Sequence, residues 1–371
     1  MRWLKRIFAT GLTLLALLAV VGVSVGWHLS ARPDDQRAKR LWYSANFKDG
    51  KFQNTEPAAP FEFSWESIDQ MLYGEEQREP PGKLPVIMVD TKTLAGKPAP
   101  GLRLIWLGHS SVLVEIDGHR VLTDPVLSER ASPFSAVGPR RFHPSPVPLQ
   151  QLTGIDAVVI SHSHYDHLDE TTVKHLAATG THFYVGLGVG THLQQWGVPK
   201  AQLHEMDWWE ALKLGALTIT ATPARHYSGR GLFDYQETLW ASWSVAGPDH
   251  RFFFSGDSGY SAQFREIGAQ LGPFDLTIIK AGSYGPGQSW ADIHMPPEES
   301  AQVHEDVRGT VWLPVHWATF NLAYHDWDEP IERAISAADP RGIPLLTPKL
   351  GELVHVTAPP VRQTWWRDVQ P

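Results

Sequence analysis

Four stretches of strand-like, apolar sequence are each followed within a few residues by side chains that bind metals in proteins. The four stretches are residues 156–160, 217–221, 251–254 and 310–315. The side chains that follow them are His162, His164, Asp166 and His167, then His226, Asp257 and His316. Because loops at strand ends are held by a rigid scaffold, they can converge, and we expect these side chains to meet at one point. This pattern requires a layered fold in which four strand ends share one edge.

The composition decides which chemistry these side chains support. The chain of 371 residues contains no cysteine, so thiolate ligands and disulfides are excluded. Imidazole and carboxylate remain, and they suit zinc and its borderline neighbours. A solvated loop that is rich in histidine by chance is a poor alternative, because the first four of these side chains fall within residues 162–167. The formal net charge of −8 argues against a nucleic-acid partner, since phosphate binding leaves a basic footprint.

Short apolar or alternating runs predict strands, and amphipathic stretches predict helices. The predicted strands cover residues 102–107, 111–116, 157–160, 217–221, 239–245, 251–254, 276–279 and 310–315. The predicted helices cover residues 171–178, 262–271, 298–306 and 330–337. The early strands are close together, with a hairpin turn at Asp117-Gly118, and the later strands alternate with helices. This order favours stacked sheets flanked by helices in one domain, residues 101–358.

The N-terminus differs in kind from the rest of the chain. Behind a short basic tail at residues 1–6, residues 7–27 carry no charge, and at about 1.5 Å per residue this run is long enough to cross a bilayer. We expect a transmembrane signal anchor, with a cleaved signal peptide as the alternative, and the main domain on the exported, periplasmic side. Residues 28–100 are expected to form a tether and an extension that packs on the domain. Residues 359–371 form a tail without an assigned role.

The segment His162-Ser163-His164-Tyr165-Asp166-His167 resembles the HxHxDH signature of the metallo-β-lactamase superfamily, and the spacing to the three later side chains fits as well. The chain more closely resembles the N-acyl-phosphatidylethanolamine-hydrolysing phospholipases D and their bacterial relatives. The stretches that carry this resemblance are residues 106–110, 123–125, 130–133, 138–142, 222–226, 240–245, 256–260 and 316–320. The resemblance covers residues 41–356 and implies an α/β fold, the metallo-β-lactamase αββα sandwich, with two metals at one edge of the sheets.

Carried over residue by residue, the resemblance implies the roles of the ligands. The first metal would be held by His162, His164 and His226. The second would be held by Asp166, His167 and His316, and Asp257 would bridge the two. Two Zn²⁺ ions are the expected cofactors, although iron and manganese accept the same ligands. Catalytic roles are implied for Asp166, Asp257 and His294.

The implied activity is that of a phosphodiesterase of the phospholipase D type. It would hydrolyse N-acyl-phosphatidylethanolamine to N-acylethanolamine and phosphatidic acid by attack of a metal-bridging hydroxide. Its partners would be a phospholipid substrate and the membrane, and a homodimer is implied by analogy with the family. A lactonase or another ester hydrolase on the same scaffold is the alternative, because fold and metals do not fix the substrate. A metal-binding envelope protein without turnover is a further alternative, against which the full ligand set argues.

Further side chains are expected to support the site. His294 would assist the leaving group or contact phosphate, although a histidine before Pro296-Pro297 also suits the start of a helix. Four more residues are expected to surround the ligands, where they would orient them or contact the substrate. They are His109, Asp124, Arg225 and Tyr260.

Overall fold

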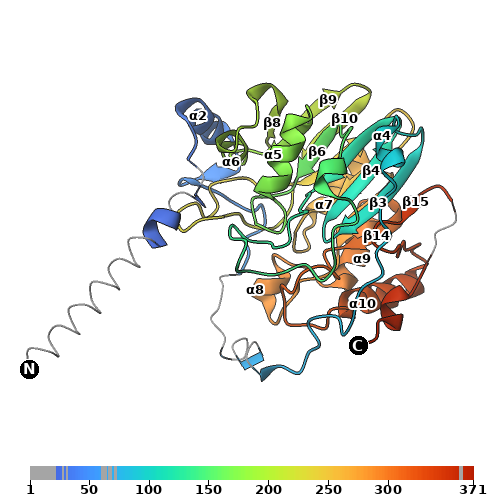
Figure 1. Cartoon of the computed structure of the whole chain (residues 1–371). Coiled ribbons are helices and arrows are strands. Elements are labelled where there is room, and N and C mark those ends of the chain that lie inside the picture. Colours follow the sequence, from blue (N-terminus) through green and yellow to red (C-terminus); the bar gives the residue numbers. More distant parts are fainter. Residues whose placement is uncertain are drawn as a thin grey trace, which may run out of the picture.

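Strands with apolar residues on both faces form the centre of the molecule. The computed structural model describes residues 22–26, 29–30, 32–59, 65, 69–70, 73–358 and 362–371 of the chain (Figure 1). Within these residues, a seven-stranded sheet packs against a six-stranded sheet. Helices cover the outer faces of both sheets, so the predicted αββα sandwich is confirmed.

The seven-stranded sheet is antiparallel at one side and parallel at the other. Its described strands are, in spatial order, β15 (Leu353–His355), β3 (Leu102–Gly108), β4 (Ser111–Ile116), β5 (His119–Thr123), β6 (Ala157–Ile160), β7 (His182–Gly186) and β8 (Leu203–Met206). Strands β15 to β5 pair antiparallel, with the β4–β5 hairpin turning at Asp117 and Gly118, and β5 to β8 pair parallel. The change of direction places the carboxyl ends of β6 and β7 at one edge.

The six-stranded sheet has the same mixed character. Its described strands are β14 (Gly309–Val315), β13 (Phe274–Lys280), β12 (Arg251–Phe254), β11 (Ser242–Ala246), β10 (Leu217–Thr222) and β9 (Ala211–Leu214). Strands β12 to β14 pair parallel, and β9 to β12 pair antiparallel. The ends of β10, β12 and β14 therefore point to one edge, which is the edge where β6 ends in the other sheet.

The period of two along each strand divides its side chains between two cores. In β4, Val112 and Val114 pack with residues of the second sheet, and Leu113 packs under the helices α5 (Glu170–Ala178) and α6 (Gly190–Gln195). The second sheet is covered by α7 (Gln263–Leu271), α9 (Pro297–Asp306) and α10 (Glu329–Ala338). The shorter described helices are α2 (Asp35–Tyr43), α4 (Thr91–Ala95), α8 (Gln288–Ala291), η1 (Leu149–Gln151), η2 (Lys200–Gln202), η3 (Asp339–Arg341) and η4 (Trp365–Asp368).

The predicted elements that border the four ligand loops are present, with ends shifted by a few residues at most. The strand predicted over residues 239–245 begins only at Ser242. The N–H groups of Leu239 and Ala241 donate instead to carbonyl groups in the loops that follow β7 and β6, so this segment ties the two sheets together. Strands β5, β7, β8, β9 and β15 were not among the predicted strands, because polar residues interrupt their apolar pattern.

The N-terminal extension lies against the domain. Besides α2 it contains the hairpin of β1 (Phe47–Lys48) and β2 (Lys51–Phe52), in which Phe52 is fully buried and donates its N–H to the carbonyl group of Gln236. Arg37 of α2 forms an ion pair of 2.6 Å with Glu205. At the other end of the chain, Trp365 is buried and stacks on Trp317 at 5.4 Å between ring centroids. Both terminal segments therefore pack next to loops of the ligand-bearing edge.

The prediction of a membrane anchor needs correction. No helix in the described part of the chain is both long enough and apolar enough to cross a membrane. Of the predicted span, residues 7–21 and 27 lie outside the described residues, and the described helical piece covers only residues 22–26. The prediction of a transmembrane helix is therefore wrong. The predicted localisation, an anchored domain on the periplasmic side, is wrong with it.

Candidate metal centre

Four loops meet at the shared edge of the two sheets, and three imidazoles form the first group of potential ligands there. Nε2 of His162 lies 2.8 Å from Nδ1 of His164, and Nε2 of His226 lies 3.4 Å from the same atom. His162 and His226 are fully buried. His162 and His164 follow β6, whereas His226 reaches the group from the loop after β10. Two sheets thus supply one site.

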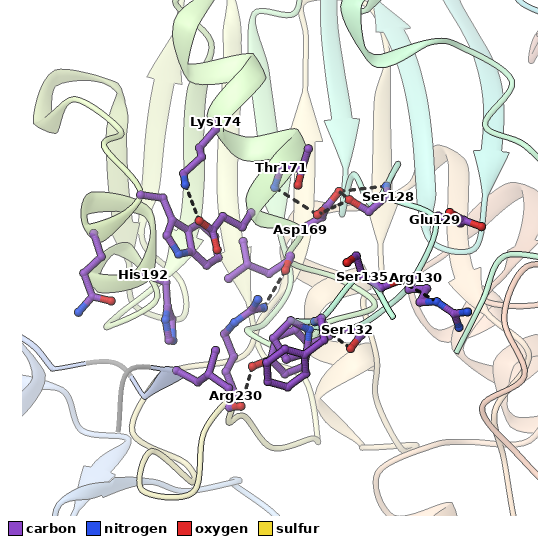
Figure 2. A pocket seen from close by; sticks show the side chains of 18 residues that line it. Ser128, Glu129, Arg130, Ser132, Ser135, Asp169, Thr171, Lys174, His192 and Arg230 are labelled. Carbon is purple, nitrogen blue, oxygen red and sulfur yellow. Dashed lines mark hydrogen bonds and ion pairs between the residues drawn. The ribbon is translucent and has the colours of Figure 1, made fainter. Parts of the chain in front are cut away.

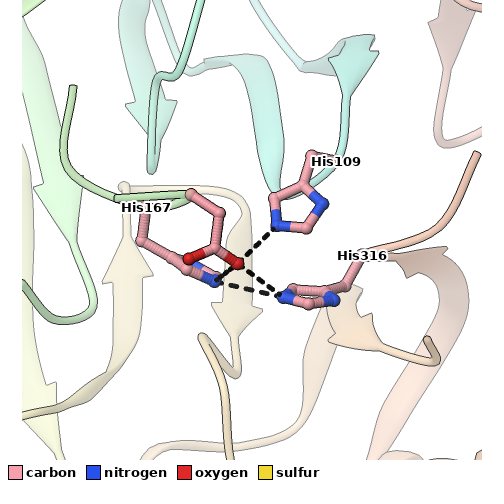
Figure 3. Close-up of side chains that lie close together, drawn as sticks. His109, His167 and His316 are labelled. Carbon is pink, nitrogen blue, oxygen red and sulfur yellow. Dashed lines mark hydrogen bonds and ion pairs between the residues drawn. The ribbon is translucent and has the colours of Figure 1, made fainter. Parts of the chain in front are cut away.

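The second group lies beside the first. Nε2 of His167 is 3.2 Å from Nε2 of His316, and Oδ2 of Asp166 is 3.4 Å and 3.5 Å from those two nitrogens. Nε2 of His109 is 3.2 Å from the same carboxylate oxygen. Figure 3 shows the rings of His109, His167 and His316 turned toward a common point.

Asp257 lies between the two groups. Its Oδ1 atom is 3.1 Å from Nε2 of His316, and its Oδ2 atom is 3.4 Å from Nε2 of His167 and 4.0 Å from Nε2 of His226. The carboxyl group is 2% exposed, so its charge is not balanced by water. A buried carboxylate that faces both groups can join two cations.

The geometry of these side chains fits metal ions. Ligands at 2.0–2.1 Å from a tetrahedral zinc are about 3.4 Å apart, and most of the separations above are 3.1–3.5 Å. Oδ1 of Asp257 is buried without a hydrogen-bond partner in the described part of the chain, although His316 is so close. This buried oxygen and the nearby imidazole nitrogens could therefore hold a metal ion between them.

Outer hydrogen bonds set which ring nitrogen faces the cluster. Nδ1 of His167 donates to Asp124 at 2.6 Å, and Nδ1 of His226 donates to the carbonyl group of Ile293 at 3.0 Å. When each ring is neutral, these bonds leave the Nε2 lone pair pointing to the centre, which is the form that binds a metal.

The electrostatics of the centre favour positive charge. Burial lowers the pKa of His226 to about 3 and that of His164 to about 4, so both rings are neutral near pH 7. Burial opposes ionisation of Asp257, but the neighbouring His316 and His167 hold the pKa of that carboxyl well below its ordinary value. Burial likewise opposes protonation of His167, yet Asp257 and Asp166 raise its pKa well above 6.5. A cation at this place is stabilised by the two carboxylates.

The backbone around the centre is strained. Non-glycine residues with positive φ angles gather here, and such conformations persist only where the surroundings enforce them. They include His109 (φ 52°), Asp124 (φ 32°), Ser283 (φ 60°), His316 (φ 69°) and Ala318 (φ 56°). The loop that follows β14 thus leaves the strand through a sharp turn at His316 and aims its ring at the cluster.

The other candidate residues of the sequence occupy different places. His294 lies at the centre, with Nδ1 3.5 Å from Oδ2 of Asp257. Asp124 lies beneath it and accepts hydrogen bonds from His167 and from the N–H group of Ser161. Arg225 turns away and pairs with Asp292 at 2.8 Å. The hydroxyl group of Tyr260 donates to Asp306 of α9, so Tyr260 also faces away from the cluster.

Arg230 supports the HxHxDH loop through hydrogen bonds to its backbone. This residue was not identified from the sequence. Its Nη1 atom donates to the carbonyl groups of Ser163 and Leu168, and its guanidinium lies over the ring of Tyr165 at 4.0 Å. Arg230 lines a cavity of about 590 Å³ next to this loop. Figure 2 shows Arg230 and His192 among the side chains of its wall. No local pattern marks an arginine that acts on a segment more than 60 residues earlier.

Two cavities adjoin the cluster. One, of about 320 Å³, is lined by ligand candidates together with Tyr227, Ser283 and Trp290. The other, of about 240 Å³, is more apolar and is lined by Ala58, Ala59 and Ile293, among others. Tyr227 lines both cavities, so it stands between the ionic and the apolar space.

An αββα sandwich that carries a His/Asp cluster able to bind metal at its sheet edge defines a metallo-hydrolase of the metallo-β-lactamase class. The chain belongs to this superfamily, since the family described as "Beta-lactamase superfamily domain" matches residues 119–317. The predicted resemblance is thereby confirmed.

Relatives extend the match beyond that domain. An uncharacterised protein of Mycobacterium tuberculosis is 45% identical over 330 residues, which are 87% of this chain and 88% of that protein. The N-acyl-phosphatidylethanolamine-hydrolysing phospholipase D 1 of Caenorhabditis elegans is 37% identical over 252 residues, 65% of this chain and 71% of that enzyme. A solved isothiocyanate hydrolase from Delia radicum gut bacteria superposes with a TM-score of 0.53 at 18% identity, over 68% of this chain and 98% of that one, which shows the shared fold.

Proposed function

We propose that this chain is a two-metal phosphodiesterase of the phospholipase D type, which hydrolyses N-acyl-phosphatidylethanolamine to N-acylethanolamine and phosphatidic acid. The observation that carries the proposal is the seven-ligand cluster in a chain that is 37% identical to the C. elegans enzyme of that name. In this proposal the first metal ion, expected to be zinc, would be held by His162, His164 and His226. The second ion would be held by Asp166, His167 and His316, and Asp257 would lie between the two.

The charge of the centre suits a phosphodiester. Among the seven ligands only Asp166 and Asp257 are anionic when the imidazoles are neutral. Two divalent ions, when bound, would supply a nucleophile by lowering the pKa of water and would clamp the reacting oxygens. The centre would then carry a net positive charge, which attracts a phosphodiester and stabilises the negative charge that develops on the phosphoryl oxygens during attack.

The side chains around the ligands have separate tasks in this reaction. His294 faces the cavity of the cluster with a buried Nδ1 atom that has no partner in the described residues. Burial lowers its pKa well below 6.5, so the neutral ring is placed to assist the departing alkoxide through an N–H group. His109 contacts the Oδ2 atom of Asp166 that His167 and His316 also face, and it helps to fix that carboxylate. The more apolar cavity beyond Tyr227 provides space for part of a lipid chain.

The substrate test compares two classes of ester on the same protein. The full chain, loaded with zinc and shown by metal analysis to hold about two ions, is mixed with N-acyl-phosphatidylethanolamine or with simple lactones. We expect release of N-acylethanolamine by mass spectrometry, and no lactone hydrolysis. Lactone hydrolysis without N-acylethanolamine would replace the proposal by the lactonase alternative. The Asp257→Ala variant is the control, and it should lose both metal and turnover.

A further inference from the structure

A segment that precedes the residues matched by the family model runs beside the loop that carries His226. Residues 52–59, here called the strap, begin at the last residue of β2 and run from the loop of His226 to the loop before α9. The ring of Phe52 is fully buried and anchors the start of the strap in the core. Glu56 accepts hydrogen bonds at 3.1 Å from the hydroxyl group of Ser261 and from the N–H group of Ala262. Ala59 donates its N–H to Asp292 at 2.7 Å. The strap is thus bonded along its whole length.

The side chain of Asn54, in the strap, forms hydrogen bonds with both the N–H and the carbonyl group of His226. Its Nδ2 atom donates to the carbonyl group of His226 at 2.8 Å, and its Oδ1 atom accepts from the N–H group of His226 at 3.0 Å. The same Oδ1 atom accepts from the indole of Trp240 at 2.9 Å. One side-chain amide therefore pairs with this residue in the way that a neighbouring strand would.

His226 needs such a partner because it lies beyond its strand. The ladder between β10 and β11 ends at Thr222 and Ser242, four residues before His226 along the chain. The residue is fully buried, so its N–H and carbonyl groups must be paired within the protein. Asn54 supplies both bonds. The carbonyl group of Ile293 then fixes the ring through Nδ1, so backbone and ring are held independently.

We propose that Asn54 is a positioning residue of the metal centre, through which the N-terminal strap holds His226 in place for the first metal. The proposal rests on the proposed role of His226 as a ligand. It makes the strap a part of the centre, although the match to the family begins only at residue 119. Arg225 strengthens the same arrangement, since it pairs with Asp292 and donates to the carbonyl group of Pro57 at 2.6 Å.

The extension offers a matched control residue. Asn46 is also half-buried, and its Nδ2 atom donates to Asp207 at 3.0 Å, a residue of the loop between β8 and β9. Asn46→Ala therefore removes one tether of the extension and leaves His226 untouched. A general loosening of the extension should appear in both variants, whereas loss of positioning should appear only when Asn54 is changed.

The test measures the affinity for Zn²⁺ at each site by competition with a chelator in the full-length chain. In Asn54→Ala we expect the first Zn²⁺ to bind 10- to 100-fold more weakly, the range typical of groups that orient ligands, with the second unchanged. Asn46→Ala should bind both ions like the parent. Asn54→Asp keeps the acceptor but sets a carboxylate against the carbonyl group of His226, so it should not rescue binding. In the Co²⁺-loaded protein, the visible absorption of one ion should change in Asn54→Ala only.

Three results would overturn the proposal. Equal affinities in the parent and Asn54→Ala would show that the strap does not position His226. Equal weakening of both ions in Asn54→Ala and Asn46→Ala would reduce Asn54 to a structural role. In His226→Ala the first ion should be lost. If that variant bound both ions normally, the ligand assignment in the proposed function would fail, and the positioning role would fail with it.

Discussion

Nδ1 of His167 lies 2.6 Å from Oδ2 of Asp124, and both side chains are fully buried. The carboxyl group also accepts a hydrogen bond of 2.6 Å from the N–H group of Ser161 and one from the Ser161 hydroxyl group. One buried acid therefore fixes Ser161, the residue before the HxHxDH segment, and the ring of His167 at the end of that segment.

Asp124→Asn should weaken the binding of the second metal ion. The amide can still accept one hydrogen bond, but it has lost the charge that orients His167 and makes its Nε2 atom more basic. We expect a 10- to 100-fold loss of Zn²⁺ affinity at that site, measured by chelator competition. Asp156→Asn is the control, because Asp156 accepts from the N–H group of Arg120 in the same sheet and touches no ligand. Unchanged affinity in Asp124→Asn would contradict this role.

His294→Ala should slow turnover and leave both metals bound. The ring faces the cavity of the cluster but lies outside the two ligand groups, so its loss removes a proton donor. A decrease in kcat of about 100-fold is expected from the usual contribution of general acid catalysis. His304→Gln, which changes a buried histidine bonded to Thr277, should leave kcat unchanged. Loss of one metal in His294→Ala would instead identify His294 as a ligand.

Arg230→Met should destabilise the chain. The change leaves the carbonyl groups of Ser163 and Leu168 without their donor, at a cost on the order of 3 kcal/mol in the free energy of unfolding. Arg230→Lys should recover only part of this, because an ammonium group lacks the planar fork of a guanidinium. Urea unfolding of the three proteins measures the difference. A change within about 0.5 kcal/mol would be that of an ordinary surface position and would contradict the support role.

Lys280 should make stability depend on pH above neutrality. Burial lowers the pKa of this fully buried lysine to about 8 from 10.5. Between those values the unfolded chain binds one more proton than the folded chain, so the free energy of unfolding rises with pH in that window. Lys280→Met removes this dependence. The stability of the parent relative to Lys280→Met should therefore rise from pH 8 to pH 10, by roughly 3 kcal/mol over the full window. A constant difference would contradict the prediction.

The sequence predicts the ligand loops because the signal is local. A run of apolar residues ends, a ligand follows, and the strand ends of stacked sheets meet at one edge. The positions of Arg225 and Tyr260 are harder to predict, because nearness to a ligand along the chain does not fix the direction of a side chain. Both turn toward other partners, Asp292 and Asp306.

The supporting contacts could not be predicted because they join distant parts of the chain. Asn54 is 172 residues from His226, and neither residue type marks the pairing. For the uncharged run at residues 7–27 the error is of the opposite kind, because the sequence predicts an element that the structure does not bear out. Its composition predicts a transmembrane helix, yet no described helix is long and apolar enough to be one.

The most direct measurement follows the oxygen of water into the products. The zinc-loaded full chain is given N-acyl-phosphatidylethanolamine in water enriched in oxygen-18, and the products are weighed by mass spectrometry. Attack of water on phosphorus predicts one labelled oxygen in phosphatidic acid and an unlabelled N-acylethanolamine, with neither product from Asp257→Ala. A label in N-acylethanolamine or in a released fatty acid would contradict the account, because the bond to the ethanolamine carbon or an acyl bond would then have been cleaved.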